Sequence, residues 1–408
     1  MGIVCALLYI RGMSGKVNSH RRTPGKRQKV AIITTRHGAQ DDRIYFKEAL
    51  SLAKKLDVVM IAPDDGEVLD WHSKVTYYPI PRRRGILGRV LSVFETVKTA
   101  RKENPDFCHV QDIDLALSLP FLRLLTRAKL IYDCHEAFPE QFLMNKGKPL
   151  LLRRLMAWAV DIFEKTFVRA ADYVVTADEA TRRSFDKIHV PSAAIFNYPP
   201  LHIFGELKSS TTKLTRSSSN RIVLVYHGSM SEDRGLFHMI EALSLLRKKG
   251  AETILLLVGL KDPSLKKKAE QLAEEGVIEN MQIIEWVPHE RISGLLKLCD
   301  IGLVPWQPEE KHKRNIPIKL FEYMACALPV VAADLPSIRP YVQKAQCGLL
   351  YDSTNAEELA GKVVELINDP QRMRQMGQNG RKAVERWWNW GKMEERLWEI
   401  YRQLGAEI

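Results

Sequence analysis

The stretch at residues 315–334, NIPIKLFEYMACALPVVAAD, determines how the second half of the chain is interpreted. Pro317 suits the first turn of a helix, because the N–H that proline lacks would have no partner there. A helix through Lys319 and Glu322 is expected to follow. The Leu-Pro pair at residues 328–329 should end this helix, and VVAA then predicts a short buried strand.

Lys319 and Glu322 are three positions apart, so they share one face of the first helical turn. The free N–H groups of that turn and the Lys319 ammonium can hold a diphosphate, while Glu322 can accept hydrogen bonds from ribose hydroxyls. Taken alone, such a pair is more often a surface ion pair. Its interpretation as a binding site therefore depends on loops elsewhere in the chain.

The composition indicates a soluble globular chain with room for two domains: 408 residues, of which 45% are apolar and 27% charged. The apolar run at residues 3–10 is far shorter than the roughly 20 residues of a membrane-spanning helix, and no convincing cleavage site follows it. No secretory signal is therefore expected. The six cysteines form no C-x-x-C pair, which favours buried free thiols in a reducing cytosol over a zinc site or disulfides.

The net charge of +12 is concentrated at the start of the chain, where seven lysines and arginines and no acid precede residue 30. Without these seven the net charge is +5, so residues 1–28 are expected to form a disordered basic extension. Two further basic clusters lie beside apolar stretches: Arg82, Arg83 and Arg84, and Arg153 and Arg154. They suit anionic lipid headgroups at least as well as nucleic acid, and an ordinary solvated face is an equal alternative.

Apolar runs alternate with amphipathic segments over residues 29–204, which predicts one doubly wound domain with a parallel sheet. Strands are expected at residues 29–34, 57–62, 107–110, 129–132, 172–176 and 193–196. Helices are expected between them at residues 44–55, 86–103, 114–126, 149–170 and 178–186.

Residues 205–220 are rich in Ser, Thr and Lys and predict a linker, after which the alternation restarts over residues 221–386. Strands are expected at residues 221–226, 253–258, 281–285, 300–304, 330–333 and 348–351, and further helices at residues 236–249, 263–275, 289–297, 355–368 and 370–386. Residues 387–408 hold a last, aromatic helix at 390–404. Ligands of such folds bind at the carboxyl ends of strands, here expected in the cleft between the domains.

Three more loops that follow predicted strands carry polar residues that packing does not require. The segment HGSM at residues 227–230, with Arg234, combines a glycine that lets the backbone approach phosphate with a cation, although such junctions are more often plain turns. His135 and Glu136 follow another strand, where a lone histidine is usually structural but the position favours function. His37 lies with Asp41, Asp42 and Arg43 in a group that could equally cap a helix.

Asp112 and Asp114 have a spacing that can hold a divalent metal against a nucleotide diphosphate. They lie far in sequence from the phosphate candidates, and residue 114 opens a predicted helix, where aspartate is a common cap. Capping is therefore the preferred interpretation, with Asp112 facing the cleft, and no metal site is expected.

Together these segments resemble one known group, the retaining, nucleotide-sugar-dependent glycosyltransferases of the GT-B fold, family four (group 1 glycosyltransferases). In the second domain the resemblance rests on YHGSMSEDRGLFHMIEAL, LLLVG, EWVPHERISGLLKLCDIGLVP and IPIKLFEYMACALPVVAAD. In the first it rests on TTRHGAQDDRIYFKEALSLAKKL, HVQDIDLALSLP and LIYDCHEAFPE. It implies two Rossmann-like domains that face a central cleft, with the donor held mainly by the C-terminal domain and the acceptor mainly by the N-terminal one. It also implies that the last helix returns to the N-terminal domain.

By position, the resemblance implies that Glu322 binds the ribose, that Arg234 and Lys319 bind the diphosphate, and that His135 reaches towards the donor sugar and the reaction centre. Two positions depart from the family pattern. Arg314 stands where a second, sugar-contacting glutamate is common, and Ser229 replaces a basic residue after the loop glycine. The expected substitutes are Asn315 and the backbone near Ile318.

The resemblance implies same-face displacement, in which the leaving diphosphate helps to deprotonate the acceptor hydroxyl and cations stabilise the charge that develops. The catalytic residues would be His135, Arg234 and Lys319. The donor-binding residues would be Gly228, Ser229, Arg234, Asn315, Ile318, Lys319 and Glu322. The acceptor-side residues would be His37, Asp42, Arg43, Asp112 and Glu136. No metal or other cofactor is expected.

The expected function is transfer of a hexosyl group from a nucleotide sugar to a lipid-linked or polysaccharide acceptor, in cell-surface glycan synthesis. The expected place is the cytoplasm, at the inner face of the cell membrane. Two alternatives are a sugar-nucleotide epimerase of the same fold and a non-catalytic basic module that binds nucleic acid. The basic module leaves the second-domain loops unexplained, so no nucleic-acid partner is expected.

Overall fold

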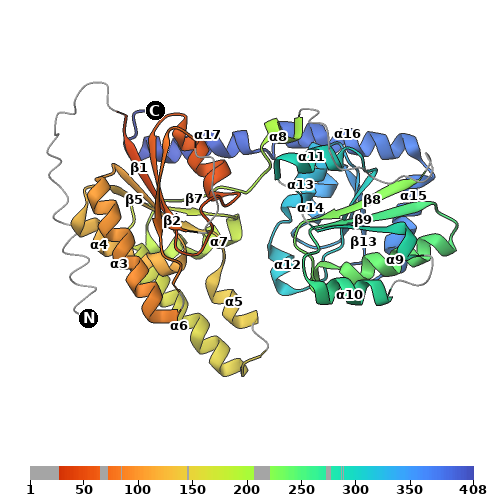
Figure 1. Ribbon diagram of the computed structural model, residues 1–408, viewed down its shortest axis with the longest axis horizontal. Coiled ribbons are helices and arrows are strands. Elements are labelled where there is room, and N and C mark those ends of the chain that lie inside the picture. Colours follow the sequence, from red (N-terminus) through yellow and green to blue (C-terminus); the bar gives the residue numbers. More distant parts are fainter. Residues whose placement is uncertain are drawn as a thin grey trace. The chain divides into compact units, whose positions relative to one another are not determined.

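The computed structural model describes residues 27–64, 72–83, 85–144, 147–205, 221–272, 277–285, 287 and 289–408. The predicted basic extension up to residue 26, Arg84 and residues 206–220 of the predicted linker lie outside the described residues. The chain divides into two compact units: unit 1 runs to Asn197 and also includes Met393–Ile408, and unit 2 is Tyr198–Lys392 (Figure 1). The boundaries expected from the sequence were residues 204 and 386.

Unit 1 is built on a parallel sheet of seven strands in the order β3-β2-β1-β4-β5-β6-β7. The strands are β1 (Lys29–Ile33), β2 (Asp57–Pro63), β3 (Val75–Ile80), β4 (Phe107–Gln111), β5 (Lys129–Cys134), β6 (Tyr173–Thr176) and β7 (Ser192–Ala194). In the register of β1, Val30 lies opposite Val58 on one side and Phe107 on the other. Because the central strands are buried on both faces, KVAII and DVVMIAP are nearly continuous apolar runs.

The helices of unit 1 connect its strands along the chain, mostly where the sequence predicts them. They are η1 (Ile44–Ala49), α2 (Leu50–Ala53), α3 (Gly85–Glu103), η2 (Ile113–Leu117), α4 (Ser118–Leu125), α5 (Phe138–Met144), α6 (Leu150–Val168), α7 (Glu179–Ser184) and η3 (Asp186–Ile188). Two elements were not predicted, β3 and α5. Pro79 lowers the strand signal of β3, but an edge strand tolerates a proline. The segment predicted as one helix at 44–55 begins instead with the π-helical turns of η1, a rare form that is frequent at functional sites.

Unit 2 repeats the plan with six parallel strands in the order β10-β9-β8-β11-β12-β13. The strands are β8 (Ile222–His227), β9 (Thr253–Val258), β10 (Met281–Ile284), β11 (Ile301–Val304), β12 (Val330–Ala333) and β13 (Gly348–Tyr351). The helices are α8 (Leu201–Gly205), η4 (Glu232–Arg234), α9 (Leu236–Lys248), α10 (Pro263–Leu272), η5 (Ile278–Asn280), α11 (His289–Leu296), α12 (Glu310–Arg314), α13 (Ile318–Ala325), α14 (Arg339–Ala345), α15 (Ala356–Ile367), α16 (Pro370–Arg386) and α17 (Trp390–Gln403). Among the described residues, no helix combines the length and apolar character needed to cross a membrane. The predicted pair of doubly wound parallel-sheet domains is confirmed.

The last helix, α17, contributes its residues from Met393 onward to unit 1. Trp398 Nε1 donates a hydrogen bond to the backbone oxygen of Ser51 at 3.2 Å. The Tyr401 hydroxyl lies 3.0 Å from Nδ1 of His109 on β4. The end of the chain is therefore part of the core of unit 1.

Each sheet has one point where the strand order reverses, between β1 and β4 in unit 1 and between β8 and β11 in unit 2. Loops that leave the carboxyl ends of these strands diverge and open a crevice, where ligands of doubly wound sheets bind. The candidate residues of unit 2 follow β8 and β11, and those of unit 1 follow β1, β4 and β5.

The stretch that the sequence singled out forms α13 followed by β12, with Pro317 immediately before the helix. Tyr323 fixes α13 to the end of β8, because its hydroxyl donates to the Val225 oxygen and accepts from the His227 N–H, both at 3.2 Å. Gly302 on β11 makes this packing possible, since a Cβ there would lie 2.5 Å from the Tyr323 ring. Replacement of this glycine would displace the helix that carries the site.

Candidate active site

Lys319 is a buried cation at the start of α13, only 7% exposed. Its Nζ lies 3.7 Å from the ring centroid of Tyr226 and 5.8 Å from that of Trp306. Within the described part of the chain, no carboxylate forms an ion pair with it. Burial lowers the pKa of Lys319 well below its usual range and the charge of Arg234 lowers it further, while Glu322 opposes the shift. A desolvated ammonium held over aromatic rings gains strongly from a bound anion.

The loop after β8 runs past this ammonium. Gly228 has a φ of +95°, and a Cβ built there would lie 3.9 Å from Lys319 Cε and Nζ. Gly228 therefore supplies a conformation that other residues rarely adopt and leaves backbone next to the cation.

The second half of the same loop brings Arg234 towards Lys319. Gly235 has a φ of +82°, and a Cβ there would lie 2.0 Å from the backbone oxygen of Pro305, so the loop passes directly against the end of β11. Arg234 Nη1 donates to the Ser229 oxygen at 2.9 Å, which closes the loop on itself. Lys319 and Arg234 thus lie beside a loop in which Gly228 leaves the backbone uncovered. Two cations next to accessible backbone N–H groups are what an anion-binding site requires.

Glu322 lies one turn further along α13 and is also buried. Its Oε2 is 3.1 Å from Nε2 of His227, the last residue of β8. The His227 ring stands edge-on to Tyr323, with centroids 5.2 Å apart. The carboxylate is therefore oriented by the strand end, and its position one helical turn from Lys319 suits recognition of hydroxyl groups beside a bound anion.

The structure brings most of the predicted donor residues of unit 2 to one strand end: Gly228, Ser229, Arg234, Lys319 and Glu322. Ser229 takes part through its carbonyl, which accepts from Arg234 and from the Tyr226 hydroxyl. Asn315 is exposed and follows α12, and Ile318 opens α13 half-buried. Arg314 is exposed at the last position of α12.

Sequence reasoning assigned no role to three contributors to this site: His227, which it named only as the start of the HGSM loop, and Tyr226 and Trp306. Each lies within two residues of the carboxyl end of a strand, and that position is the signal that could have identified them. Trp306 is held in place by stacking on His312, with centroids 4.6 Å apart and planes inclined by 27°.

In unit 1, His37 joins two aspartates in the loop after β1. Its Nε2 lies 3.2 Å from Asp112 Oδ1, and its Nδ1 lies 3.4 Å from Asp41 Oδ2. Burial alone would lower the pKa of His37, but the hydrogen bonds and charges of Asp112 and Asp41 raise it to about 10. Both imidazole nitrogens are therefore engaged within the protein.

The capping interpretation concerned Asp114, which lies in the first turn of η2, whereas Asp112 was expected to face the cleft. Asp112 precedes η2, and its side chain makes no capping hydrogen bond to this helix. Oδ2 instead accepts hydrogen bonds from Thr34 Oγ1 at 2.7 Å and from the N–H groups of Thr35 and Arg36 at 2.9 and 3.1 Å. The carboxylate is buried and joins the end of β4 to the loop after β1. Asp41 does cap: its Oδ1 accepts from the N–H groups of Arg43 and Ile44.

His135 follows β5 and lies beside His37, with ring centroids 5.1 Å apart. Its Nε2 is 3.6 Å from Oδ1 of the fully buried Asp133. The predicted neighbour Glu136 is exposed, and its carboxylate accepts from Gln141 on α5. The strand ends of unit 1 therefore present two adjacent imidazoles, each backed by a buried carboxylate.

Arg43 and Asp42, which were assigned to the acceptor side, are engaged in ion pairs within unit 1. Arg43 is buried: Nε lies 2.9 Å from Glu48 Oε1, Nη2 lies 3.2 Å from Asp133 Oδ2, and Nη1 donates to the Ile195 oxygen at 2.6 Å. Asp42 Oδ2 pairs with Lys47 at 2.7 Å. Arg43 therefore joins β5 and η1 to the residue that follows β7, and each of its three guanidinium nitrogens lies against one of these partners.

Glu48, Asp133 and His135 have ligand atoms within 4.8 Å of one another, as a metal site would. Arg43, however, already binds both carboxylates directly. Although burial opposes it, the charge of Arg43 keeps the pKa of Asp133 well below its usual range, whereas burial and the charge of Asp133 raise that of Glu48. The guanidinium supplies the positive charge that a metal would bring to this pair.

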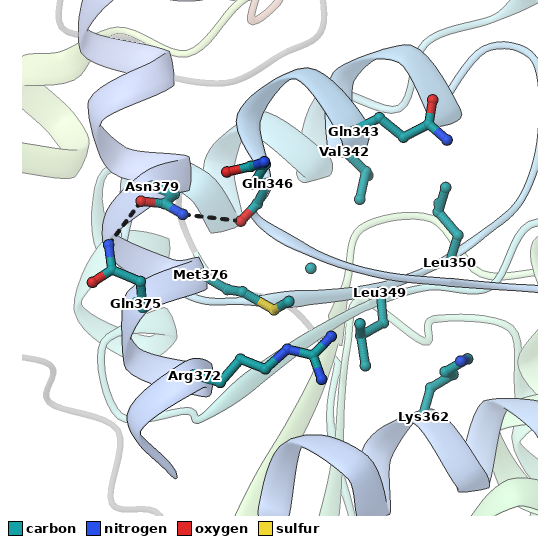
Figure 2. Close-up of a pocket in the computed structure, with 11 residues that line it drawn as sticks. Val342, Gln343, Gln346, Leu349, Leu350, Lys362, Arg372, Gln375, Met376 and Asn379 are labelled. Atoms are coloured by element: carbon teal, nitrogen blue, oxygen red, sulfur yellow. Dashed lines mark hydrogen bonds between the residues drawn. The ribbon is translucent and has the colours of Figure 1, made fainter. Parts of the chain in front are cut away.

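A pocket of about 520 Å³ lies elsewhere in unit 2, against the edge strand β13 and helices α14, α15 and α16 (Figure 2). Its two cations, Lys362 and Arg372, both pair with Glu365, at 3.3 and 2.7 Å. Asn379 accepts from Gln375 and donates to the Gln346 oxygen (Figure 2). The pocket is remote from the strand-order reversal, and its charged groups are already paired.

The contacts of His37 with Asp41 and Asp112 predict that the stability of unit 1 depends on pH. Because the pKa of His37 is raised in the folded state, its contribution is fully present below about pH 6.5 and is lost as the pH rises towards 10. The pKa of Asp41, lowered to about 2, adds stability above about pH 4 that is lost in strong acid. Since the His37 side chain is 35% exposed, solvent screening limits the effect, and His37→Gln should destabilise unit 1 by about 1–2 kcal/mol near pH 5.5 and by less near pH 9. Urea unfolding at both pH values measures this, and an equal loss at both would contradict it.

Comparison with known proteins agrees with this geometry. The family described as "Glycosyl transferases group 1" matches residues 211–383, and the family described as "Glycosyl transferase 4-like domain" matches residues 48–199. These matches together take up most of both units, and the chain belongs to the group 1 glycosyltransferases. The resemblance to the group 1 glycosyltransferases, drawn from the sequence motifs, is confirmed.

Individual relatives are distant. The chain is 26% identical over 237 residues to GDP-mannose-dependent alpha-(1-6)-phosphatidylinositol monomannoside mannosyltransferase of Mycolicibacterium smegmatis (56% of this chain, 62% of the relative). It is 27% identical over 267 residues to alpha-maltose-1-phosphate synthase of the same organism (60% and 66%). The chain thus spans less than two thirds of the length of these relatives. Sucrose-phosphate synthase from Thermosynechococcus elongatus has the same fold, GT-B, with a TM-score of 0.71 at 20% identity (94% of this chain, 100% of that one).

Proposed function

We propose that the protein transfers a hexosyl group from a nucleotide sugar to a lipid-linked or polysaccharide acceptor, with retention of the anomeric configuration. The observation that carries the proposal is Lys319, a buried ammonium held over Tyr226 and Trp306 beside Gly228 and Arg234. The names of the two relatives, which mention GDP-mannose, phosphatidylinositol monomannoside and maltose 1-phosphate, support the transfer of sugars and fit a lipid acceptor.

In this proposal the donor diphosphate binds Lys319, Arg234 and the N-terminal turn of α13, and the ribose hydroxyls donate to Glu322. The His227–Glu322 contact at 3.1 Å keeps the carboxylate turned towards the sugar nucleotide. Asn315 and Ile318 stand at the start of α13, where they can contact the donor sugar.

The chemical step needs charge stabilisation more than a protein nucleophile. As the glycosidic bond to the diphosphate breaks, negative charge grows on the leaving oxygen, and Lys319 and Arg234 stabilise it. The same oxygen removes the proton of the acceptor hydroxyl, which attacks from the same face. His135 lies at the reaction centre, oriented by Asp133. No step requires a metal ion.

The acceptor would be held by unit 1 near His37, Asp112, His135 and Glu136. Of the basic residues assigned to a membrane contact, Arg82 and Arg154 are exposed, Arg83 pairs with Glu95 at 2.6 Å, and Arg153 donates to the Leu143 oxygen. We place the enzyme in the cytoplasm, at the inner face of the membrane, in cell-surface glycan synthesis.

A donor-binding experiment tests the proposal. In a thermal-shift panel of UDP-, GDP-, ADP- and dTDP-sugars, one nucleotide class should raise the melting temperature more than the others. By calorimetry, Glu322→Ala should weaken binding of that donor about ten- to a hundredfold, because hydrogen bonds to a charged acceptor are lost, without unfolding the protein. Glu357→Ala, at an exposed glutamate of the same unit, is the control and should leave affinity unchanged. Binding of no nucleotide sugar, or an unchanged affinity of Glu322→Ala, would count against the proposal.

A further inference from the structure

Helix α6 of unit 1 carries apolar side chains on both of its faces. On one face Val160, Phe163 and Phe167 pack against the core. The opposite face carries a stripe at positions spaced by four, three and four residues: Leu151, Leu155, Trp158 and Ile162, which are between 45% and 81% exposed. A helix with apolar residues on two faces normally buries both of them. This helix is buried on one side only.

Two neighbouring helices extend the exposed stripe. Leu87, Leu91 and Phe94 are exposed on α3, and Phe121, Leu124 and Leu125 are exposed on α4. The rings of Phe94 and Phe121 meet with centroids 6.0 Å apart. Helix α4 packs against both α3 and α6, and the three lie side by side along one flank of the unit 1 sheet (Figure 1). We call these ten residues the apolar face; a connected set of this size marks an interaction surface.

The charge around the apolar face is basic. Helices α3, α4 and α6 contain eight lysines and arginines and four acids. All four acids are already engaged: Glu95 pairs with Arg83, Glu103 with Lys29 and Asp161 with Lys165, and Glu164 is buried against Tyr132. Arg154 is exposed beside the apolar residues, and Arg89 is exposed as well but lies 3.5 Å from Asp114.

This combination fits a membrane better than a second copy of the chain. Basic residues beside inserted apolar side chains bind anionic headgroups, and tryptophan favours the interface between headgroups and acyl chains. Two copies that met through this face would bring like charges together. The start of α6 and helix α5 also project beyond the sheet (Figure 1), and a projecting edge can dip into a bilayer surface.

We infer that the apolar face binds a bilayer that contains anionic lipids, with the α6 stripe inserted at the level of the headgroups. Bilayer binding stands on this surface alone; its use to reach a lipid-linked acceptor rests on the proposed function. The main contribution to bilayer binding then comes from four apolar residues rather than from the arginine clusters: Leu151, Leu155, Trp158 and Ile162.

Vesicle sedimentation of the full chain tests the inference. The protein should sediment with vesicles of phosphatidylcholine mixed equally with phosphatidylglycerol, and less with pure phosphatidylcholine. L151E/W158E should lower the partition coefficient at least about tenfold, since two inserted side chains are replaced by charges. Arg154→Glu should lower binding to the mixed vesicles roughly fivefold or more and leave binding to pure phosphatidylcholine unchanged. L272E/I278E, a matched change of exposed apolar residues in unit 2, should bind as the unaltered protein does.

Four results would overturn the inference: no sedimentation of the unaltered protein, no loss in L151E/W158E, an equal loss in the unit 2 control, or a dimer in solution that L151E/W158E dissociates. If the double variant does not fold, Leu151→Gln at an 81% exposed position replaces it, with an expected loss of about threefold. Calorimetry with the nucleotide sugar separates the two proposals. Donor binding without vesicle binding rejects only the membrane face, and vesicle binding without donor binding rejects only the proposed function.

Discussion

Lys319→Met should abolish most of the donor affinity while leaving the fold as stable as before or more stable. The ammonium is buried over Tyr226 and Trp306 without an ion-pair partner among the described residues, so it is costly to the folded protein. Methionine is similar in length to lysine and packs well against aromatic rings. The free energy of unfolding of unit 2 should therefore rise by up to about 1–2 kcal/mol. The affinity for the nucleotide sugar should fall about a hundredfold or more, because the charge-assisted bonds to the diphosphate are lost.

The pH dependence of the gain in stability distinguishes the removal of a buried charge from a general effect of methionine. The pKa of Lys319 is lowered in the folded state, so the unfolded chain binds more protons between that pKa and the ordinary lysine value of about 10.4. The gain from Lys319→Met should therefore be full at low pH and fade as the pH rises towards that value. Lys248→Met, at an exposed lysine of α9, is the control for calorimetry and urea unfolding. A marked loss of stability in Lys319→Met, or an unchanged affinity, would contradict the assignment.

Arg43→Met should destabilise unit 1 by about 3–5 kcal/mol, because it leaves Glu48 and Asp133 as buried carboxylates without their cation. Urea unfolding, followed by a probe placed in unit 1, measures the change. Donor binding measured by calorimetry under folding conditions should stay within about twofold, since Arg43 belongs to the other unit.

Arg183→Met is the matched control, because Arg183 is a 72% exposed arginine 4.0 Å from Glu179 in the same unit. It should change the free energy of unfolding by no more than about 0.5 kcal/mol. Adding Glu48→Gln and Asp133→Asn to Arg43→Met should recover part of the loss, because no charge is then left uncompensated. If Arg43→Met unfolds like the unaltered protein and only weakens the use of an acceptor, the original acceptor-side assignment is right.

The elements that position the donor site could be predicted because local sequence decides them. Pro317 before IKLFEYMA, followed by VVAA, predicts a helix and a strand in whatever domain they stand. The pair Lys319 and Glu322 follows from helical spacing. In contrast, β3 was missed because Pro79 is a poor strand signal, and only its place at the sheet edge, a property of the whole sheet, makes it acceptable.

Partners that are distant in sequence could not be predicted. Asp112 was expected to face the cleft, but one of its oxygens binds Thr34 and Thr35, nearly 80 positions earlier. Arg43 looked available because the loop around it is polar, but the chain returns at Asp133 and Ile195 to enclose it. The spacing of apolar residues in α6 also could not show that its second apolar stripe would remain exposed, because such spacing by itself predicts burial.

The return of α17 to unit 1 has a consequence for how the chain is synthesised. Unit 2 is one continuous segment, Tyr198–Lys392, and all of it leaves the ribosome before Met393–Ile408. Unit 1 needs those last residues: Trp398 and Tyr401 pack on it, and the Glu407 N–H donates to Gln28 beside β1 at 2.7 Å. Unit 2 is therefore the part that can mature first during translation. Unit 1, although its first residues are made earlier, completes its packing only when residues 393–408 have been made.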